Sequence, residues 1–116
     1  MADDDCIFCR IVAGEVPSTT VLTTDHSVAF RDLHPQAPTH VLVIPRRHVD
    51  NAAVLSHDDG DMLADLFVAA RKVAEADGIA ERGYRLAFNV GREGGNTVGH
   101  LHLHVLGGRQ MNWPPG

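Results

Sequence analysis

Three histidines alternate with apolar residues near the C-terminal end of the chain, at His100, His102 and His104. Side chains of a β-strand point alternately to its two faces, so a strand over residues 100–106 places all three imidazoles on one face, about 7 Å apart. The apolar residues between them would then enter the core. Such a row could be an exposed surface, a metal site of the His-x-His kind, or a catalytic centre with one imidazole as nucleophile.

A glycine-rich segment directly before this row favours the catalytic interpretation. Residues 91–99 contain four glycines together with Asn96 and Thr97. Backbone N–H groups and a hydroxyl could therefore approach a ligand closely, and such groups bind phosphate. Imidazole can attack phosphorus at neutral pH, because a pKa of about 6.5 leaves much of it uncharged.

The only two cysteines, Cys6 and Cys9, are spaced C-x-x-C. Such a pair can form a redox couple, bind a metal or pack as small apolar groups. The redox interpretation is the weakest, since a redox motif follows a strand and Cys6 follows only an acidic segment. A metal site would require two more ligands, and the chain has eight histidines.

Length and composition limit the classes of protein to consider. At 116 residues and 44% hydrophobic content, we expect one folded domain over residues 1–116 and no extensive disorder. No apolar run is long enough to cross a membrane and the first residues do not resemble a secretory signal, which predicts a cytoplasmic protein without membrane association. A net charge of −5 argues against nucleic-acid binding.

The hydrophobic pattern predicts an α+β fold with an antiparallel five-stranded sheet, one long helix and one short helix. We expect residues 1–5 to be frayed and residues 107–116 to form a tail. Asp5 is the expected cap of the short helix and Gly14 its end. The expected helices span residues 6–13 and 58–77, and the expected strands span residues 19–24, 27–32, 41–44, 84–90 and 100–106.

Motifs spread over nearly the whole chain resemble the histidine-triad (HIT) superfamily, and in particular its Hint branch of nucleotide-binding proteins. The row His100-x-His102-x-His104 carries part of this resemblance, and the ending Trp113-Pro114-Pro115-Gly116 makes it specific. Further matching segments are Cys6-Ile7-Phe8-Cys9, Phe30-Arg31-Asp32, residues 35–40, Val43-Ile44-Pro45, His48, Asn89 and residues 107–112. The resemblance implies a HIT-like fold, a homodimer with one continuous sheet, and a C-terminal tail near the active site.

The resemblance also implies an activity, the hydrolysis of purine nucleoside phosphoramidates to AMP or GMP through a nucleotidyl-histidine intermediate. No organic cofactor is expected, and the partners would be purine nucleoside monophosphate derivatives. Two other functions stay open at this point. One is hydrolysis or phosphorolysis of dinucleoside polyphosphates, and the other is nucleotide binding for regulation with incidental hydrolysis. A zinc-dependent scaffold is a further possibility.

Individual roles follow from the same resemblance. His102 would attack the phosphorus, His104 would hydrogen-bond the phosphate oxygens, and His40 would steady the triad. Asp32 would bind the ribose hydroxyls. The expected nucleotide-binding residues are Ile7, Phe8, Phe30, Asp32, Leu33, Asn89, Gly95, Thr97, His102 and His104.

Relatives that carry the C-x-x-C pair bind zinc through it, which implies a ligand set of Cys6, Cys9, His48 and His100. Two thiolates and two imidazoles complete a tetrahedron, so this Zn²⁺ would be structural. His100, although a member of the triad, could not then also shuttle protons.

Overall fold

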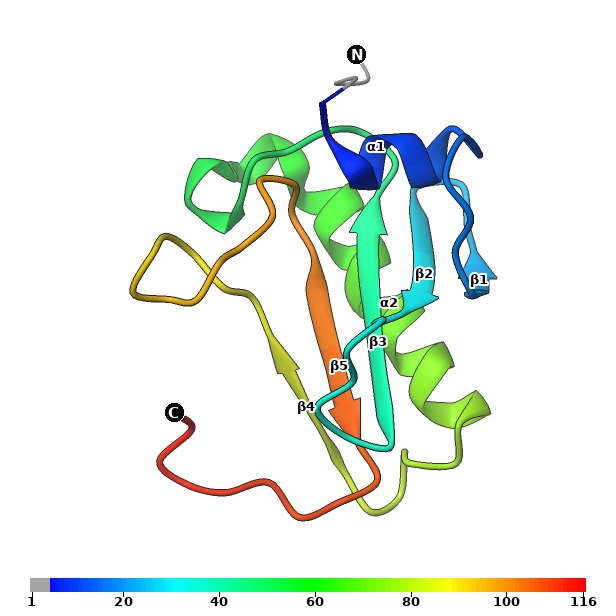
Figure 1. The fold of residues 1–116 in the computed structure, drawn as a ribbon, viewed down its shortest axis with the longest axis vertical. Helices are drawn as coiled ribbons and strands as arrows, with labels where there is room; N and C mark the ends of the chain where they lie inside the picture. The colour runs from blue at the N-terminus through cyan, green and yellow to red at the C-terminus, as the bar shows by residue number, and fades with distance from the viewer. Residues whose placement is uncertain (1–4) are drawn as a thin grey trace.

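The computed structural model describes residues 5–116, so most of the predicted frayed end, residues 1–4, lies outside the described residues. Five strands form one antiparallel sheet in the order β1-β2-β3-β5-β4 (Figure 1). The strands are β1 (Thr20–Thr23), β2 (Ser27–Arg31), β3 (Thr39–Pro45), β4 (Tyr84–Ala87) and β5 (Leu103–Gly107). The α-helices are α1 (Ile7–Val12) and α2 (Gly60–Ala76), and the 3₁₀ helices are η1 (Ala52–Val54) and η2 (His57–Asp59).

Helices α1 and α2 lie on opposite faces of the sheet (Figure 1), and each face carries its own hydrophobic core. Helix α2 packs across one face through its buried stripe, which includes Leu66, Ala70 and Val73 at helical spacing. The much shorter α1 lies against the other face, where Phe8 packs with residues of β2 and β3. The α+β class and the five-stranded antiparallel sheet are therefore confirmed.

The central strand β3 is buried along its whole length because it pairs with β2 on one side and β5 on the other. Pro38 lies immediately before β3. Because it has no backbone N–H to donate to a neighbouring strand, it marks the start of the strand. The turn before β3 and the end of β5 meet where Thr39 pairs with Gly107. This pairing brings the segment 32–38 next to the start of the C-terminal tail.

Several element boundaries differ from the prediction. The side chain of Cys6, rather than Asp5, caps α1 by accepting a hydrogen bond from the Cys9 N–H. The long helix begins two residues late because η2 precedes it, where Ser56 and Asp59 form a capping box. Strand β5 begins at Leu103, so two of the three triad histidines precede the strand instead of lying in it.

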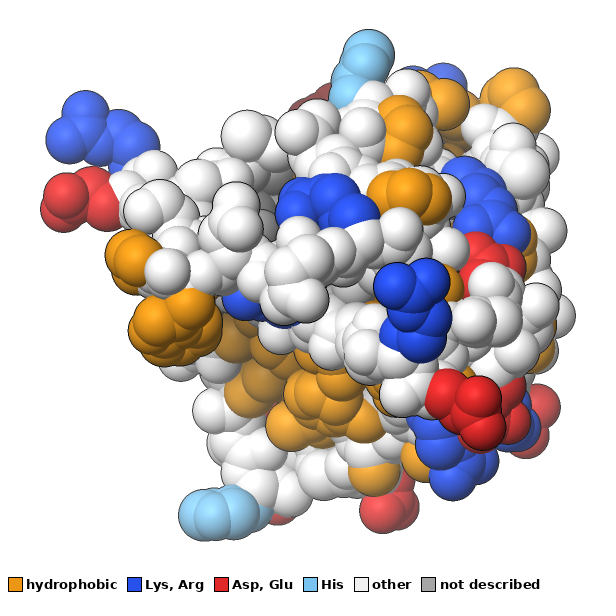
Figure 2. All heavy atoms as spheres, turned by 90° about the horizontal axis from the view of Figure 1, so that it is seen from below, with side chains coloured by type: hydrophobic (Ala, Val, Ile, Leu, Met, Phe, Trp, Pro, Cys, Tyr) orange, Lys and Arg blue, Asp and Glu red, His pale blue; other side chains and the backbone are white. Residues whose placement is uncertain are grey.

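The outer surface mixes charged and apolar side chains. Seen from the end at which the chain leaves β5, apolar side chains gather in one part, with Lys, Arg, Asp and Glu scattered around them (Figure 2).

Strand β4 is an edge strand of the sheet. Among residues 5–116, no helix combines the length and apolar character that crossing a bilayer requires.

Candidate active site and metal centre

A cavity of about 310 Å³ lies on the α1 face of the sheet. Its wall is mainly apolar, with Ile7 and Phe8 contributed by α1 and Phe30 by β2. His102 and His104 lie at the same cavity, so an apolar chamber adjoins two imidazoles. The other lining residues are Ile11, Val16, Pro17, Ser18, Thr19, Arg31, Asp32, Leu33, His34, Leu42, Thr97 and Val98.

The ring of His102 is held in one orientation and one protonation pattern. Its Nδ1 lies 2.7 Å from the backbone carbonyl oxygen of His100, and a carbonyl only accepts, so Nδ1–H is the donor. In the neutral ring the lone pair is then on Nε2. Phe8 packs edge-on against this ring, with ring centroids 5.3 Å apart. The result is a buried imidazole whose unprotonated nitrogen is free to act as a nucleophile.

A hydrogen-bond chain fixes the protons of His40 and His104 as well. The Gln36 N–H donates to His40 Nδ1 at 3.0 Å, so the proton of the neutral His40 ring must be on Nε2. That Nε2–H faces His104 Nδ1 at 2.9 Å and donates to it. His104 therefore carries its own proton on Nε2 and has one N–H to offer at the cavity.

Burial keeps the His40 and His104 rings uncharged. Burial lowers the pKa of His104 to about 4, and the nearby His102 and His40 lower it further, against a smaller opposing effect of Asp32. Burial also lowers the pKa of His40. Both rings are consequently neutral near pH 7, which is the state that the hydrogen-bond directions require.

Asp32 follows β2 and closes the site next to His40. One carboxylate oxygen accepts the His34 N–H at 2.8 Å, and the other lies 3.5 Å from His40 Nε2. The Asp32 N–H donates to the His40 carbonyl, which fixes the backbone of both residues. Asp32 thus presents a carboxylate with remaining acceptor capacity at the rim of the cavity.

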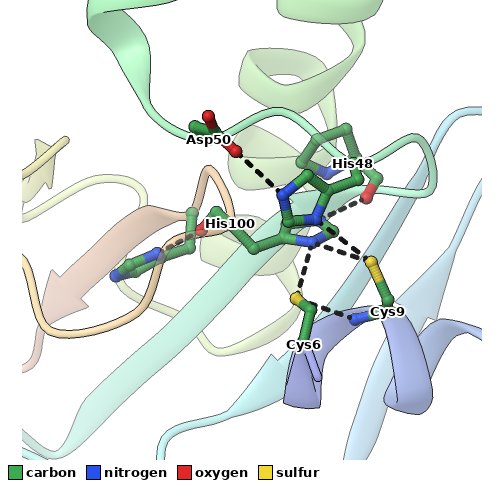
Figure 3. Close-up of polar contacts among 7 residues, drawn as sticks. Cys6, Cys9, His48, Asp50 and His100 are labelled. Carbon is green, nitrogen blue, oxygen red and sulfur yellow. Dashed lines mark hydrogen bonds and ion pairs between the residues drawn. The ribbon is translucent and has the colours of Figure 1, made fainter. Parts of the chain in front are cut away.

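A second cluster lies between α1 and the sheet and contains Cys6, Cys9, His48 and His100 (Figure 3). Their four potential ligand atoms lie within 4.8 Å of one another. His100 Nδ1 is 3.3 Å from Cys6 Sγ and 3.5 Å from Cys9 Sγ, and His48 Nδ1 is 3.2 Å from Cys9 Sγ. Three segments that are far apart in the sequence thus bring these four side chains together.

The outer nitrogen of each histidine in this cluster is already occupied. His100 Nε2–H donates to the Pro45 carbonyl at 3.0 Å, and His48 Nε2–H donates to an Asp50 carboxylate oxygen at 3.0 Å (Figure 3). Both Nδ1 atoms therefore have lone pairs aimed at the sulfur atoms. Metal-binding histidines are oriented by such outer hydrogen bonds.

The donor set and its dimensions fit a tetrahedral Zn²⁺ ion. Zinc bonds of about 2.3 Å to sulfur and about 2.0 Å to nitrogen set these donors roughly 3.5 Å apart. The three nitrogen–sulfur distances of 3.2, 3.3 and 3.5 Å agree with that value. Four protein ligands leave no open position, which is the pattern of a structural site.

Most of the residues expected to contact a nucleotide do lie at the cavity, but two do not. Asn89 and Gly95, both in the described part of the chain, are absent from its lining. Asn89 instead donates its side-chain N–H to the Gly94 carbonyl at 2.7 Å and so holds the glycine-rich loop. None of residues 107–116 lines the cavity either.

Sequence reasoning missed the segment Val16–Thr19, together with His34, as parts of the cavity wall. His34 is exposed and also lines the cavity. Nothing in its spacing distinguishes it. The Pro17 break after the short helix was a usable signal, because it turns the chain back across the sheet face that holds the histidines.

A family model and similar proteins of known sequence all point to the same protein family. The model of the HIT domain family matches residues 13–111 of the chain. An uncharacterized HIT-like protein of Synechocystis is 43% identical over 113 residues, covering 97% of this chain and 98% of that protein. The protein called adenylylsulfatase HINT1 of Arabidopsis thaliana is 44% identical over 118 residues, covering 99% of this chain and 79% of that protein.

Solved structures resemble this one along nearly its whole length. A HIT family hydrolase of Legionella pneumophila superimposes with a TM-score of 0.94 at 51% identity, covering 97% of this chain and all of that one. A histidine triad nucleotide-binding protein of Candida albicans gives a TM-score of 0.81 at 30% identity, covering 95% of this chain and 83% of that one. With His102 and His104 of the triad at the cavity, these matches show that the chain belongs to the HIT family.

Proposed function

We propose that this protein is a hydrolase that cleaves the P–N bond of purine nucleoside phosphoramidates and forms a nucleotidyl-His102 intermediate. The observation that carries the proposal is the fixed proton of His102. Because its Nδ1–H is held by the His100 carbonyl, the unprotonated Nε2 of a cavity-lining ring is the available nucleophile. The hydrolases among similar structures support the reaction type.

In the first step His102 Nε2 forms a bond to the α-phosphorus, and the bond from phosphorus to the amine breaks. The amine leaves after taking a proton from solvent. The His102 ring becomes cationic as the new bond forms, and the adjacent His100 carbonyl stabilises that charge. The His104 Nε2–H donates to a phosphate oxygen. In the second step a water oxygen bonds to phosphorus and loses a proton to solvent, the bond from phosphorus to His102 Nε2 breaks, and the nucleoside monophosphate leaves a neutral His102 ring.

The remainder of the cavity suits a nucleoside. Aromatic rings of Phe8 and Phe30, with centroids 5.4 Å apart, offer an apolar wall for a base. Asp32 would accept two ribose hydroxyls with its carboxylate, and Thr97 would donate its hydroxyl to the phosphate. Asn89 and Gly95 would act less directly, by shaping the glycine-rich loop.

We also propose that the cysteine–histidine cluster binds one structural Zn²⁺ through Cys6, Cys9, His48 and His100. When bound, the metal would supply a cross-link between the start of α1 and the segment before β5. The matching distances and the two outer hydrogen bonds support this proposal. His100 then positions the nucleophile through its carbonyl and is not itself a proton carrier.

Association into a homodimer is a further part of the proposal. Strand β4 has an unpaired edge, and exposed apolar residues lie on α2 and just after β4, namely Phe67, Val68 and Val90. Pairing of two β4 edges would create the continuous sheet that the family resemblance implies. The proposal also retains a cytoplasmic location.

The test is the release of AMP from adenosine 5′-phosphoramidate by the wild type and by His102→Ala, with His57→Ala as the control. His57 is an exposed histidine in η2, remote in sequence from the cavity-lining residues. We expect turnover by the wild type and the control and none by His102→Ala, which should still bind AMP. A reaction quenched in alkaline denaturant, in which the P–N bond to histidine survives, should show an AMP adduct on wild-type His102 by mass spectrometry. Turnover by His102→Ala at the wild-type rate would refute the mechanism.

The same assay separates the other candidate functions. The relative named as an adenylylsulfatase makes adenylyl sulfate a necessary comparison substrate. Faster cleavage of that substrate or of a dinucleoside polyphosphate would reassign the leaving group while retaining His102 as nucleophile. Binding of AMP without turnover of any of the three would favour nucleotide binding as the function.

A further inference from the structure

An exposed arginine in the C-terminal tail is tied to the loop that orients His40. The guanidinium of Arg109 donates to the Gln36 carbonyl oxygen twice, from Nε at 3.1 Å and from Nη2 at 3.0 Å. A third N–H, on Nη1, donates to the Gln110 carbonyl at 3.2 Å and braces the arginine on its own segment. The planar fork of Arg makes such a two-point contact directional.

The tail and the loop also pack closely at the preceding residue. Gly108 has a φ of +90°, and a Cβ atom placed there would lie 2.8 Å from Pro38 Cβ. A side chain at this position would therefore push the two segments apart. The close approach keeps the Arg109 side chain within reach of the Gln36 carbonyl.

The loop holds Gln36 where its N–H matters for the active site. Pro35 and Pro38 have no backbone N–H, and the Gln36 N–H donates to His40 Nδ1 at 3.0 Å. This bond decides which nitrogen of His40 carries the proton, and the His40–His104 bond passes that choice on to His104. Without it, His40 could be protonated on Nδ1 and accept at Nε2.

The reversed arrangement would harm a phosphate site. His104 would then donate from Nδ1 to His40, and its Nε2 would present a lone pair to the cavity. A lone pair repels a phosphate oxygen, whereas an N–H attracts it. The direction of the His40–His104 hydrogen bond thus determines whether His104 helps or hinders a bound phosphate.

We propose that Arg109 is a positioning residue that keeps the Gln36 N–H on His40 and thereby keeps the proton of His104 on the nitrogen available to the cavity. Its kinetic consequence rests on the proposed phosphoramidase function. Its consequence for the histidine protons does not, because those protons are present without substrate.

The experiment compares Arg109→Met and Arg109→Lys with the wild type, and uses Arg46→Met as the matched control. Arg46 is also exposed and also donates its Nε–H to a backbone carbonyl, that of Thr24, away from the cavity. Long-range ¹H–¹⁵N NMR of the imidazoles reports which ring nitrogen is protonated. The kinetic arm measures kcat and KM with adenosine 5′-phosphoramidate.

We expect the wild type and Arg46→Met to show His40 and His104 both protonated on Nε2. Arg109→Met should show mixed protonation of both rings and a roughly tenfold lower kcat with little change in KM, since a misplaced donor costs rate more than affinity. Arg109→Lys, which restores one donor, should lie between the two. If Arg109→Met fails to fold, Arg109→Lys alone decides the same question.

Unchanged wild-type nitrogen patterns in the folded Arg109 variants would overturn the proposal, whatever happens to kcat. Mixed protonation together with lower kcat supports it. Mixed protonation in the variants of a protein that does not cleave phosphoramidates would support the positioning role and overturn the proposed function, so the two failures are distinguishable.

Discussion

In both histidine clusters of this protein, a hydrogen bond to one ring nitrogen determines where the other nitrogen points, but the two clusters differ in what the free nitrogens face. In the cysteine–histidine cluster, a carbonyl holds Nε2–H of His100 and a carboxylate holds Nε2–H of His48, so both free Nδ1 atoms point inward to one centre. At the cavity, His102 Nδ1–H donates to a backbone carbonyl and His40 Nε2–H donates to His104, so the groups left free are His102 Nε2 and His104 Nε2–H. We call the cysteine–histidine cluster the closed cluster, because its free nitrogens face its own sulfur atoms, and the histidines at the cavity the open cluster, because their free groups face the cavity.

The difference shows that a histidine's role is set by what occupies its other nitrogen. His100 and His102 are two residues apart in the chain, yet a carbonyl bound to Nε2 leaves the Nδ1 of His100 facing the sulfur atoms, and a carbonyl bound to Nδ1 leaves the Nε2 of His102 free at the cavity. The clusters are also linked, because the carbonyl that orients His102 belongs to His100. Loss of the cysteine–histidine cluster should therefore also disturb His102, whereas changes at the cavity should leave that cluster intact.

We expect the largest effect when a sulfur atom is removed from the closed cluster of Cys6, Cys9, His48 and His100. Cys9→Ser removes the sulfur that approaches both His48 and His100. We expect zinc content, measured by elemental analysis, to fall from one ion per chain to almost none, and Tm to drop by at least about 10 °C. His102→Ala is the matched control and should retain its zinc. Equal zinc content and equal Tm in Cys9→Ser and the wild type would refute the structural metal.

A smaller but purely catalytic effect is expected at the open cluster. His104→Ala removes the N–H aimed at the phosphate, and kcat should fall about 10²–10³-fold, the usual cost of a lost transition-state donor. His104→Gln keeps an N–H donor and should recover part of that loss. Zinc content should be unchanged in both variants. A kcat within twofold of the wild type would remove His104 from the mechanism.

A change at Asp32, at the rim of the cavity, should raise KM more than it lowers kcat. Asp32→Asn keeps an oxygen for the His34 N–H but loses the carboxylate charge. We expect KM to rise about tenfold for the phosphoramidate of adenosine, because charged acceptors make stronger hydrogen bonds to hydroxyls. The phosphoramidate of 2′,3′-dideoxyadenosine lacks those hydroxyls and should show no such rise. Equal losses on both substrates would mean that Asp32 does not bind the ribose.

The smallest effect is a pH dependence of stability. The pKa of His104 is about 4 in the folded chain against 6.5 for the free group, so the unfolded chain takes up a proton first as pH falls. Its contribution is complete above pH 6.5 and is lost as pH falls from 6.5 towards 4. The carboxyl of Asp77, whose pKa the Arg31 hydrogen bond lowers from 3.8, loses its contribution only at lower pH.

Urea unfolding at pH 7.5 and pH 5.0 tests this pH dependence. The wild type should lose stability between the two values, corresponding to a few degrees in Tm, and His104→Gln should lose less. An equal loss in the variant would show that other groups are responsible.

The sequence predicted the α+β fold and the positions of the helices and strands well, because apolar periodicity and proline breaks are local signals. It also placed the apolar residues between the triad histidines correctly, since Leu101, Leu103 and Val105 all enter the core with α2. The hydrogen-bond chain through Gln36 could not be predicted. It depends on the distance between the loop before β3 and the tail after β5, which only the folded sheet defines.

The expected zinc ligands rest on a family resemblance, and no sequence signal indicates the hydrogen bonds that His100 and His48 donate to Pro45 and Asp50. Homodimer formation and a cytoplasmic location stay predictions.

The unequal size of the two helices has a consequence for how ligands enter and leave. A helix of six residues is not stable alone in water, so α1 depends on Phe8 and on the contacts of Cys6 and Cys9. It also carries Ile7 and Phe8 of the cavity wall. Local opening of α1 would move Ile7 and Phe8 away from the cavity while the sheet and α2 stay folded, and the rate of that opening would limit the exchange of any ligand too large for the closed entrance.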